Sequence, residues 1–183
     1  MHENFGIMSN IVIDAIKTRR SIRKYTDEQV SESDLKEILD AGTYAPTGHN
    51  FQDPIIIAVR NQQVIEKLVK MNAAILGTDG NPYYGAKTII LVFVPFPEKN
   101  GNAIQDGSLV LGNMMLAAHS LGLVSCWINR EREMFSTLEG AELMKEFGIP
   151  DGYMGLGALS VGHPTRPTPS PLPRKENYYK IIE

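Results

Sequence analysis

The chain has 183 residues, of which 18 are Lys or Arg and 21 are Asp or Glu, so its formal net charge is −3. This balance argues against a protein whose main task is to coat nucleic acid or an anionic membrane. The length fits one domain over residues 1–183, and 43% hydrophobic with 21% charged residues excludes collagen, coiled-coil and wholly disordered classes. A single cysteine, Cys126, excludes an intramolecular disulfide and a metal site built from several cysteines.

Neither a targeting segment nor a membrane span is predicted. Residues 1–10 lack the basic start and the long apolar run of a signal peptide. The longest strongly apolar runs, residues 55–59 and 89–96, fall far short of the ~20 residues that cross a bilayer. We therefore expect a cytoplasmic protein with neither membrane nor nucleic acid as a partner.

Hydrophobic periodicity and turn-forming residues divide the chain into helices and strands. The predicted helices, in chain order, span residues 9–20, 32–42, 63–75, 103–121 and 141–147. The predicted strands span residues 55–59, 88–93, 123–128 and 154–161. The sum is an α+β fold, with a central mixed or antiparallel sheet of about four to five strands surrounded by helices.

Three of these elements carry a more specific expectation. Ser31 is suited to cap the second helix together with Asp34, three residues on. Residues 55–59 are continuously apolar and mostly β-branched, which predicts a strand buried on both faces. Apolar residues nearly encircle the axis of helix 103–121, which predicts a central, buried helix.

The end of the chain reads as an extended arm. Five of the eleven prolines fall within residues 164–173, a density that excludes helix and central strand. Residues 178–182 are then too apolar for a free end. We expect residues 166–183 to form an arm that packs on a second subunit.

A basic run, residues 19–24, ends the first predicted helix. Cations at a helix C-terminus contribute roughly 0.3–1 kcal/mol each through the helix dipole. Three arginines in five positions exceed what a helix end needs, and arginine suits bidentate phosphate binding. The residues alone leave phosphate binding and a solvated basic end as equal alternatives.

Three other segments carry polar or unusual residues. Residues 46–52 form a polar turn before a strand, residues 122–130 hold the only tryptophan beside the only cysteine, and residues 162–175 end in a basic pair. Taken singly, each favours a structural reading: an ordinary turn, a core aromatic with a small buried thiol, and a solvated tail. Neither His49 nor Cys126 acquires a role, and no metal site or side-chain acid, base or nucleophile is predicted.

Taken in order, however, these segments resemble the nitroreductase family of flavin-dependent oxidoreductases. The resemblance rests on Arg19–Arg23, Pro46–Gln52, Asn113–Ala118, Leu121–Ile128 and Gly162–Pro164 with Arg174-Lys175. It covers roughly residues 11–176 and implies a nitroreductase-like fold with an extended C-terminal arm. It also implies an intertwined homodimer that holds FMN, non-covalently, at the subunit interface.

The resemblance further implies roles for individual residues. Arg19, Ser21 and Arg174 would meet the FMN phosphate and ribityl chain, and Arg23 the pyrimidine edge. The turn at residues 46–52 of the other subunit would approach the isoalloxazine, and the backbone near Asn129 its N5 and O4. The full implied cofactor set is Arg19, Arg20, Ser21, Arg23, Pro46, Thr47, Asn50, Gln52, Trp127, Ile128, Asn129, Arg130, Gly162 and Arg174.

The activity implied is that of an FMN-dependent NAD(P)H oxidoreductase. Hydride from NADH or NADPH would pass to flavin N5, and a nitroaromatic, quinone or similar acceptor would then take the nicotinamide's place. Such a reaction requires no side-chain acid or base. The alternatives are a specialised flavin enzyme, such as a reductive dehalogenase or flavin-fragmenting enzyme, and a non-enzymatic flavin-binding module. A third reading makes the arginine run a salt-bridge patch between subunits.

Overall fold

One antiparallel sheet forms the centre of the computed structural model, which describes residues 10–183. Its strands lie in the order β1-β2-β4-β3, and each neighbouring pair is antiparallel. The strands are β1 (Ile55–Val59), β2 (Thr88–Pro95), β3 (Val124–Ile128) and β4 (Tyr153–Gly162). The predicted α+β class is confirmed for the described residues, and the sheet, predicted as mixed or antiparallel with about four to five strands, is antiparallel with four.

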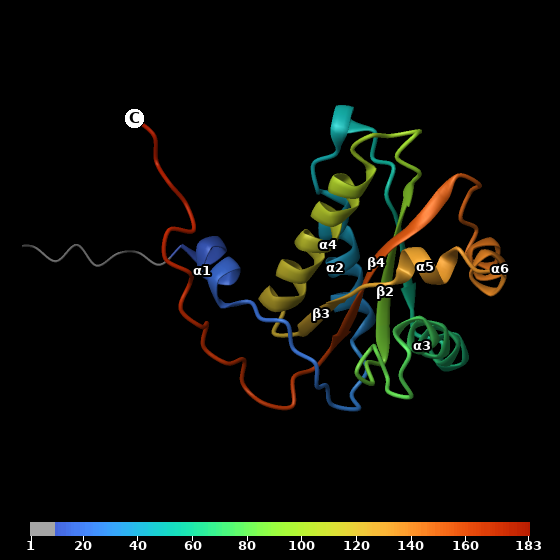
Figure 1. Ribbon diagram of the computed structural model, residues 1–183. Coiled ribbons are helices and arrows are strands. Elements are labelled where there is room, and N and C mark those ends of the chain that lie inside the picture. The colour runs from blue at the N-terminus through green and yellow to red at the C-terminus, as the bar shows by residue number, and fades with distance from the viewer. Residues whose placement is uncertain (1–9) are drawn as a thin grey trace, which may run out of the picture.

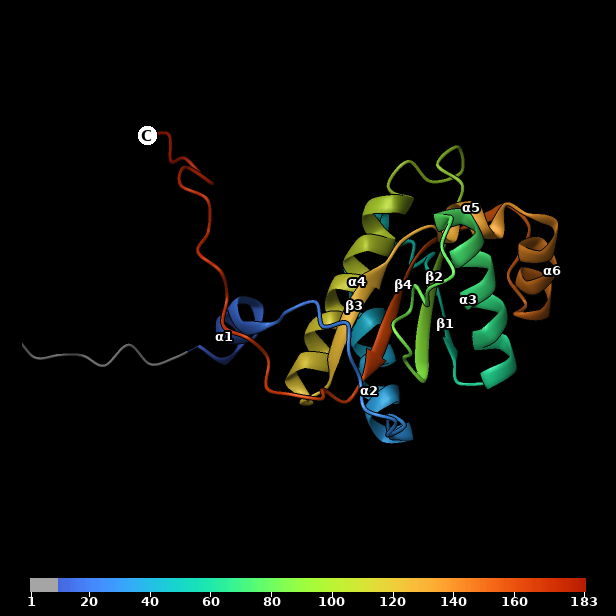
Figure 2. The same cartoon turned by 60° about the horizontal axis from the view of Figure 1, so that its bottom comes forward.

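Helices cover both faces of this sheet, as Figures 1 and 2 show. They are α1 (Ile11–Thr18), α2 (Glu32–Thr43), α3 (Gln62–Leu76), α4 (Ala103–Ser120), α5 (Glu131–Phe135) and α6 (Leu138–Glu146), with a 3-10 turn, η1 (Gly48–Asn50). α2 and α4 pack on one face, and α3, α5 and α6 on the other. The side chains of β2 alternate between the two cores, so β2 is buried along its whole length. The sequence predicted the helices apart from α5; Ser9, where the first was expected to begin, lies outside the described residues.

The start of α2 is capped as predicted. Ser31 Oγ accepts a hydrogen bond from Asp34 N at 3.0 Å and donates to Asp34 Oδ2 at 2.7 Å. This reciprocal arrangement satisfies an N–H group that the first turn of a helix otherwise leaves unpaired. It fixes the residue at which the chain enters α2.

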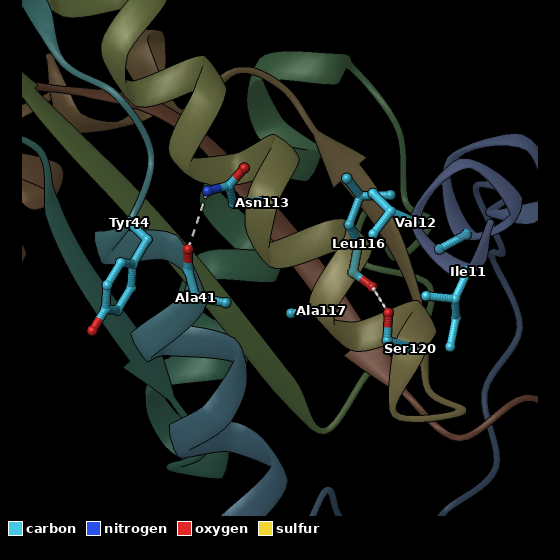
Figure 3. Close-up of a pocket in the computed structure, with 9 residues that line it drawn as sticks. Ile11, Val12, Ala41, Tyr44, Asn113, Leu116, Ala117 and Ser120 are labelled. Carbon is cyan, nitrogen blue, oxygen red and sulfur yellow. Dashed lines mark hydrogen bonds between the residues drawn. The ribbon is translucent and has the colours of Figure 1, made fainter.

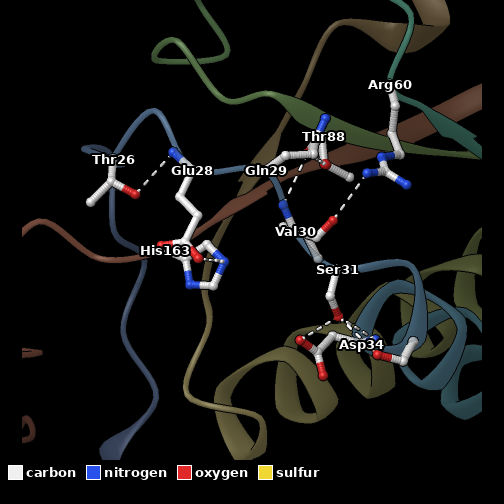
Figure 4. A network of polar contacts seen from close by, with 10 residues as sticks. Thr26, Glu28, Gln29, Val30, Ser31, Asp34, Arg60, Thr88 and His163 are labelled. Carbon is white, nitrogen blue, oxygen red and sulfur yellow. Dashed lines mark hydrogen bonds and ion pairs between the residues drawn. The ribbon is translucent and has the colours of Figure 1, made fainter.

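The segment before α2 is tied to the sheet through Gln29 (Figure 4). Its Oε1 accepts from Thr88 Oγ1 at 2.6 Å and from Val30 N at 3.0 Å. Arg60 Nη2 adds a hydrogen bond to Val30 O at 3.2 Å. The chain between the basic run and α2 is therefore anchored to β1 and β2.

Two burial predictions were wrong for the described chain. β1 is an edge strand, and residues 55–58 are only half-buried because β2 covers one side of it. α4 buries the face toward the sheet, but Ile104, Leu109 and Leu121 beside it stay 41–47% exposed. The apolar pattern of α4 therefore predicted more burial than the described chain provides.

Close packing of α4 on the sheet depends on Gly107. A Cβ added there would lie 2.4 Å from Leu156 Cδ2 and 2.5 Å from Val94 Cγ1. Gly107→Ala is expected to lower the free energy of unfolding by about 1–2 kcal/mol, because overpacking outweighs the ~1 kcal/mol by which helix propensity favours alanine. Urea unfolding measures the change, with the exposed Gln105→Ala as a near-neutral control. A more stable Gly107→Ala protein would contradict the close approach.

The chain after β4 is the extended arm that the prolines predicted. Residues 165–183 contain neither helix nor strand, and they leave the sheet, pass α1 and run away from it (Figures 1 and 2). The apolar residues of the arm are exposed, with Leu172 at 80% and Tyr179 at 84%. Among residues 10–183, no helix combines the length and apolarity needed to cross a membrane.

Candidate functional site

The basic run follows α1 and lies against β3. Ser21 forms a parallel bridge with Ser125, and Ile22 N donates to Ser125 O at 3.1 Å. Further on, Gly162 packs on the Tyr25 ring, where an added Cβ would lie 2.9 Å from Cδ1. The run is therefore held beside the start of β3 and the end of β4, with Arg19 and Arg20 at one end and Arg23 at the other.

Several buried polar atoms near this point have no partner. Arg19 Nη1, Arg20 Nε and Ser125 Oγ are buried without a hydrogen bond among the described residues. Burial lowers the pKa of Arg19, and the neighbouring charge of Arg20 lowers it further. A buried donor left unsatisfied costs about 1–3 kcal/mol, so two adjacent guanidiniums in this state favour a bound anion.

The arm brings a third arginine to the same place. An open cavity of about 620 Å³ is lined by Arg19, Arg20 and Arg174 together with Ile16, Lys17, Pro171, Leu172 and Pro173. Residues more than 150 positions apart therefore line one cationic cavity. Its donors fit a phosphate monoester, whose oxygens accept the bidentate hydrogen bonds of arginine.

Arg23 lies apart from this cavity and is stacked on an aromatic ring. Its guanidinium carbon is 5.8 Å from the centroid of the exposed Tyr84 ring. Cys126 is buried beneath the run, and burial raises the pKa of its thiol against the lowering effects of Arg23 and Arg19. The prediction of Cys126 as a small buried residue is confirmed, and a thiolate nucleophile is disfavoured.

The residues after β3 form a turn whose conformation is fixed by hydrogen bonds with neighbouring side chains. Ile128 points into the core, while the half-buried Trp127 donates from Nε1 to Asn129 Oδ1 at 2.8 Å. Arg130 has a φ of +84°, a left-handed conformation that is rare for arginine. Strain of this kind persists only where the surroundings determine the backbone, and it is common at binding sites.

A buried network of polar side chains surrounds Arg130 and holds its backbone in this conformation. Asn72 donates from Nδ2 to Asn129 O at 2.9 Å and accepts from Arg130 Nε at 2.8 Å. Tyr83 OH donates to Glu131 Oε1 at 3.0 Å, and Glu131 Oε2 has no hydrogen-bond partner within residues 10–183. Sequence reasoning missed Asn72, Tyr83 and Glu131. The available signal was Asn72, a polar residue four positions after Leu68 on the apolar stripe of α3.

The predicted turn at residues 46–52 is strained as well. His49, Asn50 and Gln52 have φ values of 53–55°. Thr47 Oγ1 accepts from Gln52 N at 3.1 Å, and Asn50 Oδ1 accepts from Gln52 Nε2 at 3.1 Å. Internal hydrogen bonds therefore link Thr47, Asn50 and Gln52 in a defined conformation, with Pro46 exposed at its start.

A buried carboxylate ties this turn to α4. Asp106, which is 4% exposed, accepts from Gly48 N at 3.0 Å and from Asn100 Nδ2 at 3.4 Å. Sequence reasoning assigned no role to Asp106 because a single polar residue in a helix is ordinary.

Asp106→Asn is expected to lower the free energy of unfolding by about 2 kcal/mol and to loosen the turn. The new amide would face the Asn100 amide, donor against donor, and hydrogen bonds to charged groups contribute about 1.5–3 kcal/mol. Urea unfolding and limited proteolysis of the turn measure the two effects. The exposed Asp79→Asn is the control, and equal stability of the two variants would contradict the role of Asp106.

One chain does not bring the two halves of the predicted site together. Asp106, in the first turn of α4, contacts the turn at Gly48, whereas His119, in its last turn, contacts Thr18 beside the basic run. At 1.5 Å per residue these points are about 20 Å apart along the helix. Figure 1 shows η1 above one end of α4 and α1 beside the other.

Comparison with known proteins places this fold and site in a family. The nitroreductase family profile matches residues 16–82 and 83–163. A protein of Methanothermobacter thermautotrophicus named as a candidate NADH dehydrogenase/NAD(P)H nitroreductase is 34% identical over 84% of this chain and 77% of its own. An FMN reductase [NAD(P)H] of Bacillus subtilis is 27% identical over 85% of this chain and 66% of its own.

A solved structure extends the likeness to the whole fold. The crystal structure of a nitroreductase with bound FMN from Bacteroides fragilis has a TM-score of 0.86 and is 30% identical, covering 96% of this chain and 100% of that one. This chain therefore belongs to the nitroreductase family, as the order of its motifs predicted.

Proposed function

We propose that this protein is an FMN-dependent NAD(P)H oxidoreductase. The observation that carries the proposal is the pair of guanidiniums with buried, unpartnered N–H groups, Arg19 and Arg20, beside a cavity that Arg174 also lines. Relatives named for FMN or NAD(P)H, and a similar structure with bound FMN, indicate which phosphate monoester the cavity takes.

Within this proposal each group of residues has a distinct task. Arg19, Arg20 and Arg174 bind the phosphate, and Ser21 the adjoining ribityl chain. Arg23, as a nearby cation, offsets the negative charge of a reduced isoalloxazine. The Asn72-braced turn at Asn129 and Arg130 presents backbone groups to the ring. FMN, when bound, supplies the hydride-accepting and hydride-donating chemistry between NAD(P)H and a nitroaromatic, quinone or similar acceptor.

The site is completed by a second copy of the chain. α1 has no buried residue, and its apolar side chains include Ile11 at 83% exposure. An apolar groove of about 520 Å³ lies between α1, α2 and α4 (Figure 3). It is lined by Ile11, Val12, Ala15, Ala41, Tyr44, Asn113, Leu116, Ala117 and Ser120. Exposed apolar surface of this kind marks an interface. The partner's α4 and the apolar arm of residues 166–183 supply its cover, and the partner's 46–52 turn supplies the missing half of the site.

An anaerobic titration tests this function. The purified protein is mixed with FMN, freed of excess ligand, and titrated with NADH and then NADPH while flavin absorbance is followed. Bleaching, followed by steady-state turnover with menadione or nitrofurazone, supports the oxidoreductase. Retention of FMN without turnover would favour a flavin-binding module, and no retention of added FMN would overturn the proposal. Sedimentation velocity tests the homodimer separately.

A further inference from the structure

The loop between α3 and β2 carries two adjacent tyrosines, one buried and one at the surface. Tyr83 is fully buried, whereas Tyr84 is 40% exposed. Tyr84 has a φ of +57°, a left-handed conformation that is uncommon for an aromatic residue. The loop is held in this shape by Asn81, whose Oδ1 accepts from Tyr83 N at 2.9 Å and whose backbone O accepts from Tyr84 N at 3.0 Å. Strain that is fixed in this way is common at functional sites.

The buried tyrosine ties this loop to the turn after β3. Tyr83 OH donates to Glu131 Oε1 at 3.0 Å and accepts from Asn72 Nδ2 at 3.4 Å. The same Asn72 Nδ2 donates to Asn129 O at 2.9 Å. The loop and the turn at Asn129 therefore belong to one buried network. The exposed ring of Tyr84, next in the chain to Tyr83, has a fixed position relative to that turn.

The exposed tyrosine contacts the basic run. The guanidinium carbon of Arg23 lies 5.8 Å from the centroid of the Tyr84 ring, which is within the range of a cation–π contact. The backbone beside Arg23 is fixed, because Ile22 N donates to Ser125 O at 3.1 Å and Ile22 O accepts from Tyr25 OH at 2.7 Å. The Arg23 side chain is exposed, and a long side chain of this kind samples many rotamers unless a contact selects one. The Tyr84 ring provides that contact.

We propose that Tyr84 is a positioning residue of the flavin site, which holds the Arg23 guanidinium in place and thereby raises the reduction potential of the bound flavin. This inference rests on the proposed function, which supplies FMN as the ligand and Arg23 as the cation near its ring. When NAD(P)H gives up a hydride and becomes NAD(P)+, the flavin gains two electrons and one proton, and so one negative charge. A cation that is already in place stabilises that charge better than one that must first be ordered.

The strength of such a contact sets the size of the expected effect. A cation–π contact at an exposed site changes a population by about two- to fivefold. Loss of the Tyr84 ring should reduce the preference of the protein for reduced over oxidised FMN by the same factor. The midpoint potential would then fall by about 10–20 mV, because a factor of ten corresponds to about 30 mV for a two-electron couple.

The midpoint potential of bound FMN tests the inference. It is measured by anaerobic reduction against a reference dye for the native protein, Tyr84→Ala, Tyr84→Gly and Tyr84→Phe. The Ala and Gly variants should have the lower potential, and the Phe variant, which keeps a ring face, should stay close to the native value. Glycine adopts a positive φ without strain, so Tyr84→Gly removes the ring and relaxes the loop at once. A native potential in both the Ala and the Gly variant would overturn the inference.

A double-mutant cycle shows whether Tyr84 acts through Arg23. Arg23→Gln should lower the potential more than Tyr84→Ala does, and adding Tyr84→Ala to Arg23→Gln should have no further effect. Lys24→Gln is the matched control, because it removes the neighbouring exposed cation of the same run. In that background the effect of Tyr84→Ala should remain. An equal effect of Tyr84→Ala with and without Arg23 would contradict the positioning role, since the ring would then act on the flavin directly.

The contact can also be measured in protein without FMN, which separates the failures of the two proposals. The ring current of Tyr84 should shift the NMR signals of the Arg23 side chain upfield in the native protein and in Tyr84→Phe, but not in Tyr84→Ala. Arg23→Gln identifies these signals by their loss. If the native protein binds no FMN, the proposed function fails and this shift still reports on the contact. If FMN binds and NAD(P)H bleaches it, but native protein and Tyr84→Ala share one potential, the function stands and the role of Tyr84 fails.

Discussion

Replacing Arg19 with alanine is expected to weaken FMN binding about 10- to 100-fold. Charge-assisted hydrogen bonds contribute roughly 1.5–3 kcal/mol each, and every 1.4 kcal/mol is a factor of ten in affinity. Arg19 is the arginine whose pKa burial lowers, and it lines the cavity with a buried Nη1 that lacks a partner among the described residues, so its loss removes an unsatisfied cationic donor from this place. Flavin fluorescence titration at fixed ionic strength measures the effect.

Two further proteins sharpen this test. Arg19→Lys keeps the positive charge but loses the planar, bidentate guanidinium. Its affinity for FMN should therefore lie between those of the native protein and Arg19→Ala. Arg132→Ala removes an exposed arginine of α5 and should bind FMN normally. If Arg19→Ala keeps its full affinity for FMN and the dimer instead dissociates more readily, the arginine run is a salt-bridge patch between subunits.

Replacing Glu131 with glutamine is expected to stabilise the protein by about 2 kcal/mol above pH 7. Glu131 is fully buried, and burial raises the pKa of its carboxyl from 4.5 to about 7, against the lowering effects of Tyr83 and Arg130. Each pH unit of difference corresponds to about 1.4 kcal/mol, so ionisation of the buried carboxyl costs about 3 kcal/mol. Glutamine avoids that cost, but its amide NH2 group replaces an oxygen that lacks a partner among the described residues.

The sign of the pH dependence follows from the same shift. Between pH 4.5 and about 7 the folded protein keeps the Glu131 proton that the unfolded chain has released. This contribution to stability is therefore lost as the pH rises through that window, and it is constant above it. Urea unfolding from pH 5 to 8 should show the decline in the native protein and not in Glu131→Gln. Glu139→Gln, an exposed position in the first turn of α6, is the control; a decline that persists in Glu131→Gln would assign it to another group.

Local chemistry was enough to predict most of the helices and strands. The cap at Ser31, the β-branched runs and the proline-rich arm each depend on a few neighbouring residues, and the structure agrees with them. α5 was missed because Glu131 to Phe135 shows no apolar stripe, and its burial comes from Gly155 on β4. An added Cβ at Gly155 would lie 2.6 Å from Glu131 O, so the helix sits directly on the strand.

Sequence reasoning did not single out the buried polar residues near the candidate site. A run of arginines in a sequence indicates a possible anion site. Asn72 and Asp106 are each a single polar residue within a helix, and a single polar residue indicates no particular function. Their importance arises from partners about 60 residues away in sequence, Asn129 and Gly48. Likewise, the sequence of one chain contains both halves of the proposed site but does not show that α4 separates them.

The central position of β4 in the sheet also governs when the protein can fold during synthesis. β4 pairs with both β2 and β3, and it is the last strand or helix that the structure describes. Until Tyr153–Gly162 leaves the ribosome, β2 and β3 have no shared neighbour, and both hydrophobic cores lack the side chains that β4 contributes. Folding of this domain therefore waits for the synthesis of β4, and a ribosome stalled before β4 would expose the apolar residues of β2 to chaperones and proteases.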